Sequence, residues 1–200
     1  MFTINSSKTR KQQGFTLIEL LIALAVLSVI VAGIVVFFNP SKSKGQTLYA
    51  SMSAIGKAAT RFNLDTSCYP YQTNLLFSKT AVSGNTNNSC GVDVSSTWNG
   101  PYIQSRPVNG SGNITYPQIG QGVAISIASG TFLSNGLSPQ YAVEATGVPV
   151  SIAKQALQAC SGGSPTTTSG SYTIASNCFT TTPASGSNTE TFGLVFASGS

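Results

Sequence analysis

The sequence predicts an α+β fold in which a long N-terminal helix packs on an antiparallel β-sheet. Three features indicate it: a long apolar run near the amino end, an apolar stripe with helical spacing directly after it, and alternating apolar and polar residues in the C-terminal half. An amphipathic helix must cover its stripe with a second layer, which a sheet with one apolar face supplies. The expected parts are a leader, 1–14, an apolar helix, 15–40, an amphipathic helix, 41–64, and a globular head, 65–200.

The apolar run extends from Phe15 to Phe38 and is long enough, as a helix, to cross a hydrocarbon layer of about 30 Å. Basic residues precede it and would hold the amino end in the cytoplasm, so that everything after Pro40 lies outside. The carboxylate of Glu19 interrupts the run, and a charge in a membrane segment costs on the order of a few kcal/mol. An uncleaved signal anchor, or a cleaved signal peptide, explains the run but not this carboxylate.

The amphipathic helix continues the apolar one, so together they predict a single helix of about 50 residues, roughly 75 Å long. Pro40 is the expected point of a bend or break, because proline lacks a backbone donor and clashes with the preceding turn. Gly33 is a second weak point. The apolar stripe recurs at steps of three and four residues and consists of Leu48, Met52, Ile55, Ala59 and Phe62.

The rest of the chain is expected to be loop-rich up to residue 120 and strand-rich after it. Trp98, Pro101 and Tyr102 belong to a compact aromatic element that we expect to fasten the loop to the core. A short helix is expected over 149–160, and the Ser- and Thr-rich segment 161–190 is expected to be a surface loop. The predicted strands are 122–128, 141–146, 172–175 and 192–197.

Four cysteines, Cys68, Cys90, Cys160 and Cys178, all follow the apolar run. Their spacings fit no C-x-x-C metal pattern, which favours two disulfides formed in an oxidising compartment over a metal site. Four cysteines allow three pairings, of which we favour the local pairs 68–90 and 160–178. Each such loop would stabilise the fold by roughly 3 kcal/mol in the chain-entropy model.

Charge and residue types argue against an enzyme and against a nucleic-acid-binding protein. Only 8% of the residues are charged, compared with about 25% in typical soluble domains, and much of the net charge of +5 lies in the leader. No basic stripe is evident, so nucleic acid is not expected as a partner. The chain has no histidine, and Asp65, Asp93, Glu144 and Glu190 show no recognised catalytic spacing. We therefore expect no catalytic residues, no metal and no cofactor.

The start of the apolar run carries an ordered motif that resembles the type IV pilin family, which includes the pseudopilins of type II secretion. The matching residues are Lys11, Gly14, Phe15, Thr16, Leu17, Ile18 and Glu19, followed by Leu20, Leu21, Ile22 and Ala23. The resemblance implies that a prepilin peptidase cuts between Gly14 and Phe15 on the cytoplasmic side and N-methylates Phe15. Glu19 then becomes the fifth residue of the mature chain. The implied fold is pilin-like, with a disulfide-bounded C-terminal loop.

The same resemblance gives Glu19 a role in assembly. In a filament of this kind the apolar helices bundle, and Glu19 of one subunit pairs with the new α-ammonium of a neighbour. Because a buried charge is costly, such a pair acts on register and recruitment more than on stability. The implied partners are other copies of the chain or other pilins, the inner membrane before assembly, the prepilin peptidase, the assembly platform and, as a candidate, a host receptor. The implied location is the inner membrane for the precursor and an extracellular filament afterwards.

Three functions fit the resemblance. The first is a structural subunit of a type IV pilus, used for adhesion, motility, DNA uptake or mating. The second is a secretion pseudopilin; those of the major kind often bind calcium through carboxylates in a C-terminal loop, whereas residues 161–189 contain no Asp or Glu. The third is a minor pilin that binds DNA, which requires five cations to converge: Lys57, Arg61, Lys79, Arg106 and Lys154.

The pilin subclass stays open. Phe15 after the cleavage glycine resembles type IVa pilins, whereas a helix before Cys160 resembles type IVb pilins more closely. Many family members have a helix-breaking proline at the place that Val36 occupies in this chain, so the position of the bend stays open as well.

Overall fold

The computed structural model describes residues 15–37, 39–80, 82, 86–133, 138–163 and 166–199. In the first helix it describes side-chain surroundings as far as Val31. The predicted leader, including Gly14, lies outside the described residues. The chain divides into two compact units, Met1–Asn39 and Pro40–Ser200, each of which is treated by itself below.

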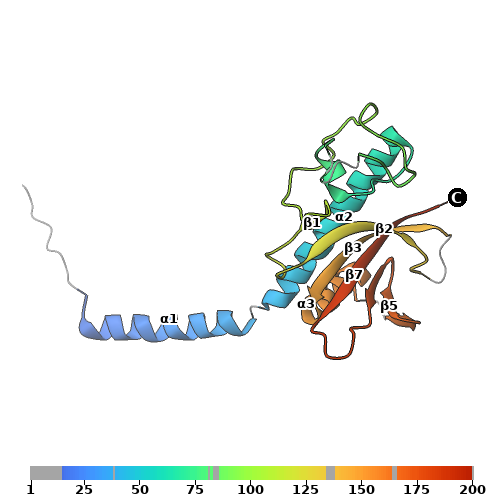
Figure 1. Ribbon diagram of the computed structural model, residues 1–200. Coiled ribbons are helices and arrows are strands. Elements are labelled where there is room, and N and C mark those ends of the chain that lie inside the picture. Colours follow the sequence, from blue (N-terminus) through green and yellow to red (C-terminus); the bar gives the residue numbers. More distant parts are fainter. Residues whose placement is uncertain are drawn as a thin grey trace, which may run out of the picture. The chain divides into compact units, whose positions relative to one another are not determined.

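The first unit contains helix α1, Leu17–Phe37 (Figure 1). Each large apolar side chain described between Phe15 and Val31 is at least 52% exposed within the single chain. A helix that is apolar on every side has no polar face to turn toward water. Over these residues α1 therefore presents apolar surface around its whole circumference.

The structure divides the predicted long helix in two, since α1 ends at Phe37 and helix α2 extends over Pro40–Thr66. Proline has no N–H to donate to a preceding turn, and it disfavours the helical conformation in the residue before it. At the first position of a helix proline is well tolerated, because the N–H there would have no partner within the helix. Pro40 therefore begins α2 and does not kink one continuous helix.

The predicted apolar stripe of α2 is confirmed as the face that packs on the core of the second unit. Each of its five residues is at most 1% exposed, and all of them belong to the largest apolar cluster. The stripe residues are Leu48, Met52, Ile55, Ala59 and Phe62. Their burial holds α2 against the sheet, because apolar area removed from water contributes about 25 cal/mol per Å².

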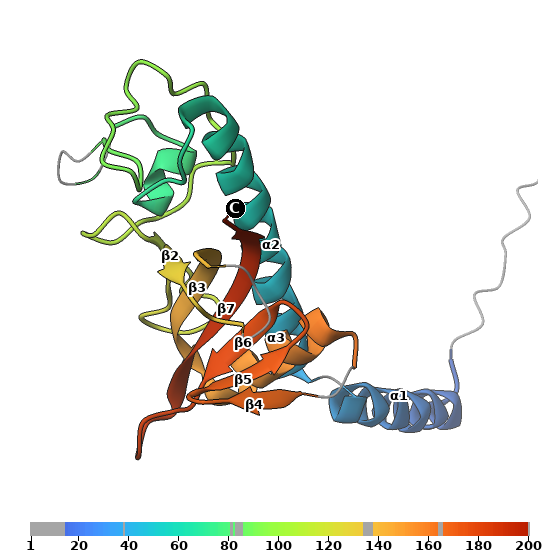
Figure 2. The ribbon, with the colours of Figure 1, turned by 90° about the vertical axis from the view of Figure 1, so that its right-hand side faces the viewer.

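In the described residues, the second unit is built on a seven-stranded antiparallel sheet with the order β1-β2-β3-β7-β6-β5-β4 (Figures 1 and 2). The strands are β1, Ile114–Thr115, β2, Ala124–Gly130, β3, Gln140–Pro149, β4, Thr167–Ser169, β5, Tyr172–Ala175, β6, Cys178–Thr181, and β7, Thr189–Ser198. Helix α3, Val150–Ser161, follows β3 directly and ends at Gly162, whose left-handed conformation closes the helix. The four predicted strands and the predicted short helix are thus confirmed; strand 172–175 has the predicted bounds, and the other elements have shifted ends.

Helices α2 and α3 cover one face of this sheet, as Figure 2 shows. The two helices approach each other closely at Gly45, which is buried against α3. A Cβ atom at this position would lie 2.6 Å from the Cβ of Gln155 and 2.7 Å from the backbone nitrogen of Ala156. Only glycine permits this distance between the helices, because any side chain would overlap the backbone of α3.

The other face of the sheet carries a second, smaller apolar cluster. Phe132 and Phe179 stack with ring centroids 4.9 Å apart, and Tyr172 meets Phe179 edge-on. Phe179 also lies over Gly193, its cross-strand partner, where any Cβ would collide with the ring. The buried members of this cluster are Phe132, Ala142, Ile174, Phe179 and Val195.

The described residues of 161–190 hold the strands β4, β5 and β6 and the start of β7, where the sequence predicts one strand within a surface loop. The Ser- and Thr-rich composition is typical of loops, yet threonine is β-branched and favours extended backbone. Apolar residues at alternate positions of β5 and β6 reach the second cluster, as Ile174 and Phe179 do. Tertiary packing therefore organises a segment whose composition alone predicts a loop.

The segment between α2 and β1 is largely loop, with the short 3-10 helix η1, Thr73–Leu76, and its predicted aromatic anchor is confirmed. The indole N–H of Trp98 donates to the carbonyl oxygen of Leu75 at 2.7 Å. The hydroxyl of Tyr102 donates to Asp65 Oδ2 at 2.7 Å. The Tyr102 ring meets Phe62 of α2 edge-on, with centroids 5.6 Å apart. These contacts fasten the loop to the end of α2.

Candidate functional site

Thr16 and Glu19 together close the first turn of α1. Glu19 Oε2 accepts two hydrogen bonds from Thr16, one from its backbone N–H and one from its hydroxyl, each at 2.9 Å. The backbone N–H of Glu19 donates in return to Thr16 Oγ1 at 3.4 Å. This reciprocal arrangement is a capping box with Thr16 as the N-cap. It gives partners to backbone N–H groups that the start of a helix leaves without any.

The capping box occupies one carboxylate oxygen of Glu19 and leaves the other available. Oε1 accepts no hydrogen bond from the residues that the structure describes. A carboxylate has about four acceptor positions, so Glu19 can hold Thr16 and accept from a further donor at the same time. Phe15, next to the cap, is 89% exposed. The first turn of α1 therefore combines a fixed carboxylate with an accessible acceptor oxygen.

Thr16 is a site residue whose role the sequence interpretation missed. The motif includes Thr16, but we assigned a role in assembly only to Glu19. The signal is present in the sequence, because a threonine followed three positions later by glutamate, just before an apolar run, is the signature of a capping box. Recognising it requires the helix to begin at residue 17, as it does in the structure.

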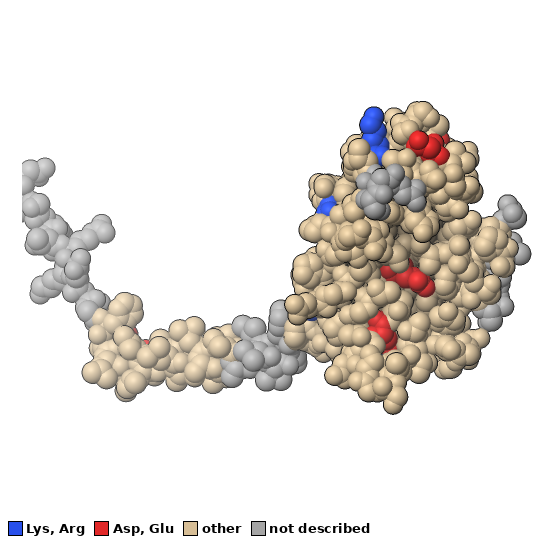
Figure 3. Space-filling view, in the orientation of Figure 1, with Lys and Arg blue, Asp and Glu red and all other residues tan. Residues whose placement is uncertain are grey.

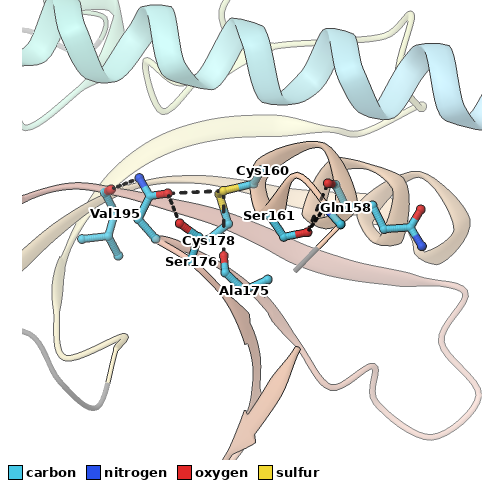
Figure 4. The surroundings of a disulfide bond; sticks show 9 residues. Gln158, Cys160, Ser161, Ala175, Ser176, Cys178 and Val195 are labelled. Atoms are coloured by element: carbon cyan, nitrogen blue, oxygen red, sulfur yellow. Dashed lines mark hydrogen bonds between the residues drawn. A yellow bond between two sulfur atoms is a disulfide. The ribbon is translucent and has the colours of Figure 1, made fainter. Parts of the chain in front are cut away.

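Two disulfides join separate segments of the head. Cys68 pairs with Cys90, and Cys160 pairs with Cys178. The second bridge connects the last turn of α3 to the first residue of β6 (Figure 4). Asn177, beside this bridge, donates from Nδ2 to the carbonyl oxygen of Val195 at 3.0 Å. The bridge and this hydrogen bond fix α3 and the start of β6 to β7.

The cations required for a DNA-binding face lie on different elements of the head. Lys57 and Arg61 belong to α2, Lys154 belongs to α3, and Lys79 and Arg106 belong to loops. On the face drawn in Figure 3, charged side chains are few and lie apart. Proteins that bind nucleic acid gather their cations on one surface, and this face shows no such gathering among the described residues.

The acidic residues of the head occupy separate places. Asp93 accepts from Thr86 and Ser95, and the backbone N–H of Ser95 is the main cause that lowers the pKa of the Asp93 carboxyl. Burial raises the pKa values of Glu144 and Glu190, which project from opposite faces of the sheet. No group of three or more His, Cys, Asp or Glu residues that could hold a metal is present in the described ranges.

The comparisons with known proteins identify the signal at the amino end. The family model for the prokaryotic N-terminal methylation motif matches residues 9–35. This segment thus carries the class III signal that type IV pilins and pseudopilins share. No curated protein and no solved structure matches the chain. Within the described residues, no helix combines the length and apolar character needed to cross a membrane.

Proposed function

We propose that this protein is a structural subunit of a type IV pilus, cut after Gly14 and polymerised through α1 into a filament. One observation carries the proposal. Within the segment that matches the methylation motif, residues 17–31 form a helix that is apolar on all sides, and its first turn holds a capped carboxylate with an accessible oxygen. An apolar surface of this kind needs cover from lipid or from other helices.

The capping box is compatible with cleavage between Gly14 and Phe15. The cut leaves an α-ammonium on Phe15, and Thr16 becomes the second residue with its amide N–H intact. Glu19 can therefore keep both hydrogen bonds from Thr16 through Oε2. Oε1 then accepts from the α-ammonium of a neighbouring subunit in the filament core. An unpaired charge among apolar helices is costly, so the pair selects subunits in the correct register.

The same apolar surface serves before and after assembly. In the precursor the inner membrane covers α1, with the leader in the cytoplasm and the disulfide-bonded head outside. During assembly the helices of other subunits replace the lipid. The head, which folds as its own compact unit from Pro40 onward, is carried to the filament surface without change in its core.

The test is the mass of the protein in sheared surface filaments, taken before and after reduction. The proposal predicts the mass of the chain beginning at Phe15 plus one methyl group, and a gain of about four hydrogens on reduction of the two disulfides. A Gly14→Leu variant is the control, because it should block cleavage and leave the precursor in the membrane. A processed, methylated chain that stays in the cell envelope would indicate a pseudopilin. An unprocessed chain in the membrane would contradict both functions.

A further inference from the structure

The head contains a pocket of about 350 Å³ between α3 and the strands β5, β6 and β7, on the helix-covered face of the sheet. Its volume lies within the range of small-molecule sites, which begins at about 300 Å³. Figure 2 shows α3 beside this part of the sheet. The pocket shares no residue with the capped carboxylate of α1, so an inference from it goes beyond the proposed filament function.

A buried carboxylate lines the pocket. Glu190 of β7 is only 7% exposed and lies on the same face of the strand as Phe192 and Leu194, which pack on the helices. Its Oε1 has no hydrogen-bond partner among the described residues. A buried polar atom without a partner is costly and calls for a physical explanation. A positively charged group in the pocket would compensate the buried charge of this carboxylate.

The other walls of the pocket are cationic, hydroxylic and apolar. Lys154 projects from α3 and lowers the pKa of Glu190 by its charge, although burial outweighs it, and the described residues include no ion pair between the two. Thr173 and Thr180 are cross-strand neighbours whose hydroxyls make no hydrogen bond within the described part of the chain. Leu157 adds an apolar wall. The pocket thus presents one negative group, one positive group and two unused hydroxyls.

We propose that this pocket binds a small zwitterion, such as an amino acid, whose ammonium pairs with Glu190 and whose carboxylate pairs with Lys154. Of the simple ligand classes, only a zwitterion gives an opposite charge to both groups. An anion alone would face the carboxylate of Glu190, and a cation alone would face the ammonium of Lys154. A neutral polyol would offer only dipoles to a buried charge, which charge-assisted hydrogen bonds satisfy better. Thr173 and Thr180 would donate to the ligand carboxylate.

The test measures binding to the full chain in detergent micelles by isothermal titration calorimetry. Glycine, β-alanine and γ-aminobutyrate serve as zwitterionic probes whose charges are progressively farther apart. Glycerol, acetate and ethylamine serve as neutral, anionic and cationic probes of similar size. At least one zwitterion should bind with a Kd of about 1 mM or tighter, and at least about tenfold more tightly than any of the other three probes.

Variants locate the binding. Glu190→Gln and Lys154→Met should each lower the affinity at least about tenfold, because each removes one charge pair. Glu144→Gln and Lys57→Met are the matched controls, since Glu144 lies on the opposite face of the sheet and Lys57 lies on α2. Neither control should alter the affinity. Circular dichroism establishes that each variant is folded, and Lys154→Met carries the test if Glu190→Gln does not fold.

Three results would overturn the proposal. The first is that none of the zwitterions binds. The second is that glycerol, acetate or ethylamine binds as tightly as the best zwitterion. The third is that a zwitterion binds equally well to the wild type and to both pocket variants.

Discussion

Thr16 holds the carboxylate of Glu19 against the start of its own helix through two hydrogen bonds of 2.9 Å, from its backbone N–H and its hydroxyl. In the sequence Glu19 appears as an isolated charge in an apolar run, but in the structure it has a local partner. The carboxylate is thereby oriented before any second subunit arrives. Glu19 has two separate properties, its capping hydrogen bonds with Thr16 and its negative charge, and substitutions can remove one without the other.

Glu19→Gln should abolish filaments while leaving cleavage intact. Glutamine can take the place of glutamate in a capping box, so the variant keeps the cap and loses only the charge that pairs with a neighbour. Filament yield after shearing, together with the mass of the membrane-bound chain, measures both effects. A normal filament yield from this variant would contradict the prediction and would show that assembly needs the capping hydrogen bonds but not the charge of Glu19.

Thr16→Ala should weaken the start of α1 by about 1 kcal/mol, the usual effect of losing an N-cap side chain. The filament yield should fall but not vanish, because the charge of Glu19 remains. Thr16→Ser is the matched control, since serine keeps the capping hydroxyl, and it should assemble like the wild type. If alanine and serine at position 16 give equal yields, the capping role is refuted.

Gly45→Ala should destabilise the head by about 1–3 kcal/mol, the range for an overpacked contact. The new Cβ would lie 2.6 Å from Gln155 Cβ and would push α2 and α3 apart. Thermal unfolding followed by circular dichroism measures the loss. Ser43→Ala, at an exposed position two residues earlier in α2, should leave the midpoint unchanged. An unchanged midpoint for Gly45→Ala would mean that the helices are not in close contact.

Loss of Cys160–Cys178 should affect the head differently from loss of Cys68–Cys90. The two loops span 18 and 22 residues, so chain entropy predicts similar losses of about 3 kcal/mol for each. Only the Cys160–Cys178 bridge joins α3 to β6. Hydrogen exchange should therefore increase along α3 and β6 in Cys160→Ser/Cys178→Ser, and not in Cys68→Ser/Cys90→Ser. Equal exchange in both variants would rule out the tethering role.

The stability of the head should fall as the pH rises above 4.5, the ordinary pKa of glutamate, because burial raises the pKa of Glu144. Between the two pKa values the folded state keeps a proton that the unfolded chain releases, so the free energy of unfolding decreases with pH. The slope is at most about 1.4 kcal/mol per pH unit for one carboxyl. Urea unfolding of Glu144→Gln should show a smaller slope than the wild type, and identical slopes would contradict the assignment.

Asp93→Asn is a control for this pH dependence, because the Asp93 carboxyl changes the free energy of unfolding with pH in the opposite direction to Glu144. Hydrogen bonds from Ser95 and Thr86 lower the pKa of the Asp93 carboxyl below its ordinary value of 3.8. Its contribution to stability is complete above that value and is lost as the pH falls through the folded pKa. In urea unfolding, Asp93→Asn should therefore lose less stability than the wild type as the pH falls below 3.8. The change of the free energy of unfolding with pH above 4.5 should stay the same.

The sequence predicts those parts of the fold whose signal is local. The stripe of α2 follows from helical periodicity, and the aromatic anchor follows from residues within five positions of one another, Trp98 to Tyr102. Strands β4 and β6 were missed because Ser- and Thr-rich composition predicts loop. Strand β6 packs through Phe179, which stacks on Phe132, a residue that follows β2 on the far side of β3 and β7 in the sheet.

The methylation motif follows from the sequence alone, whereas the pocket follows only from the tertiary structure. The sequence by itself determined the apolar helix, the position of Glu19 and the signal over residues 9–35, because each is encoded within one or two helical turns or one continuous run. Only the tertiary structure decided that Glu190 of β7 and Lys154 of α3 share a pocket. They lie on different elements, and the sheet order that places α3 over β7 is set by long-range pairing, which local periodicity does not encode.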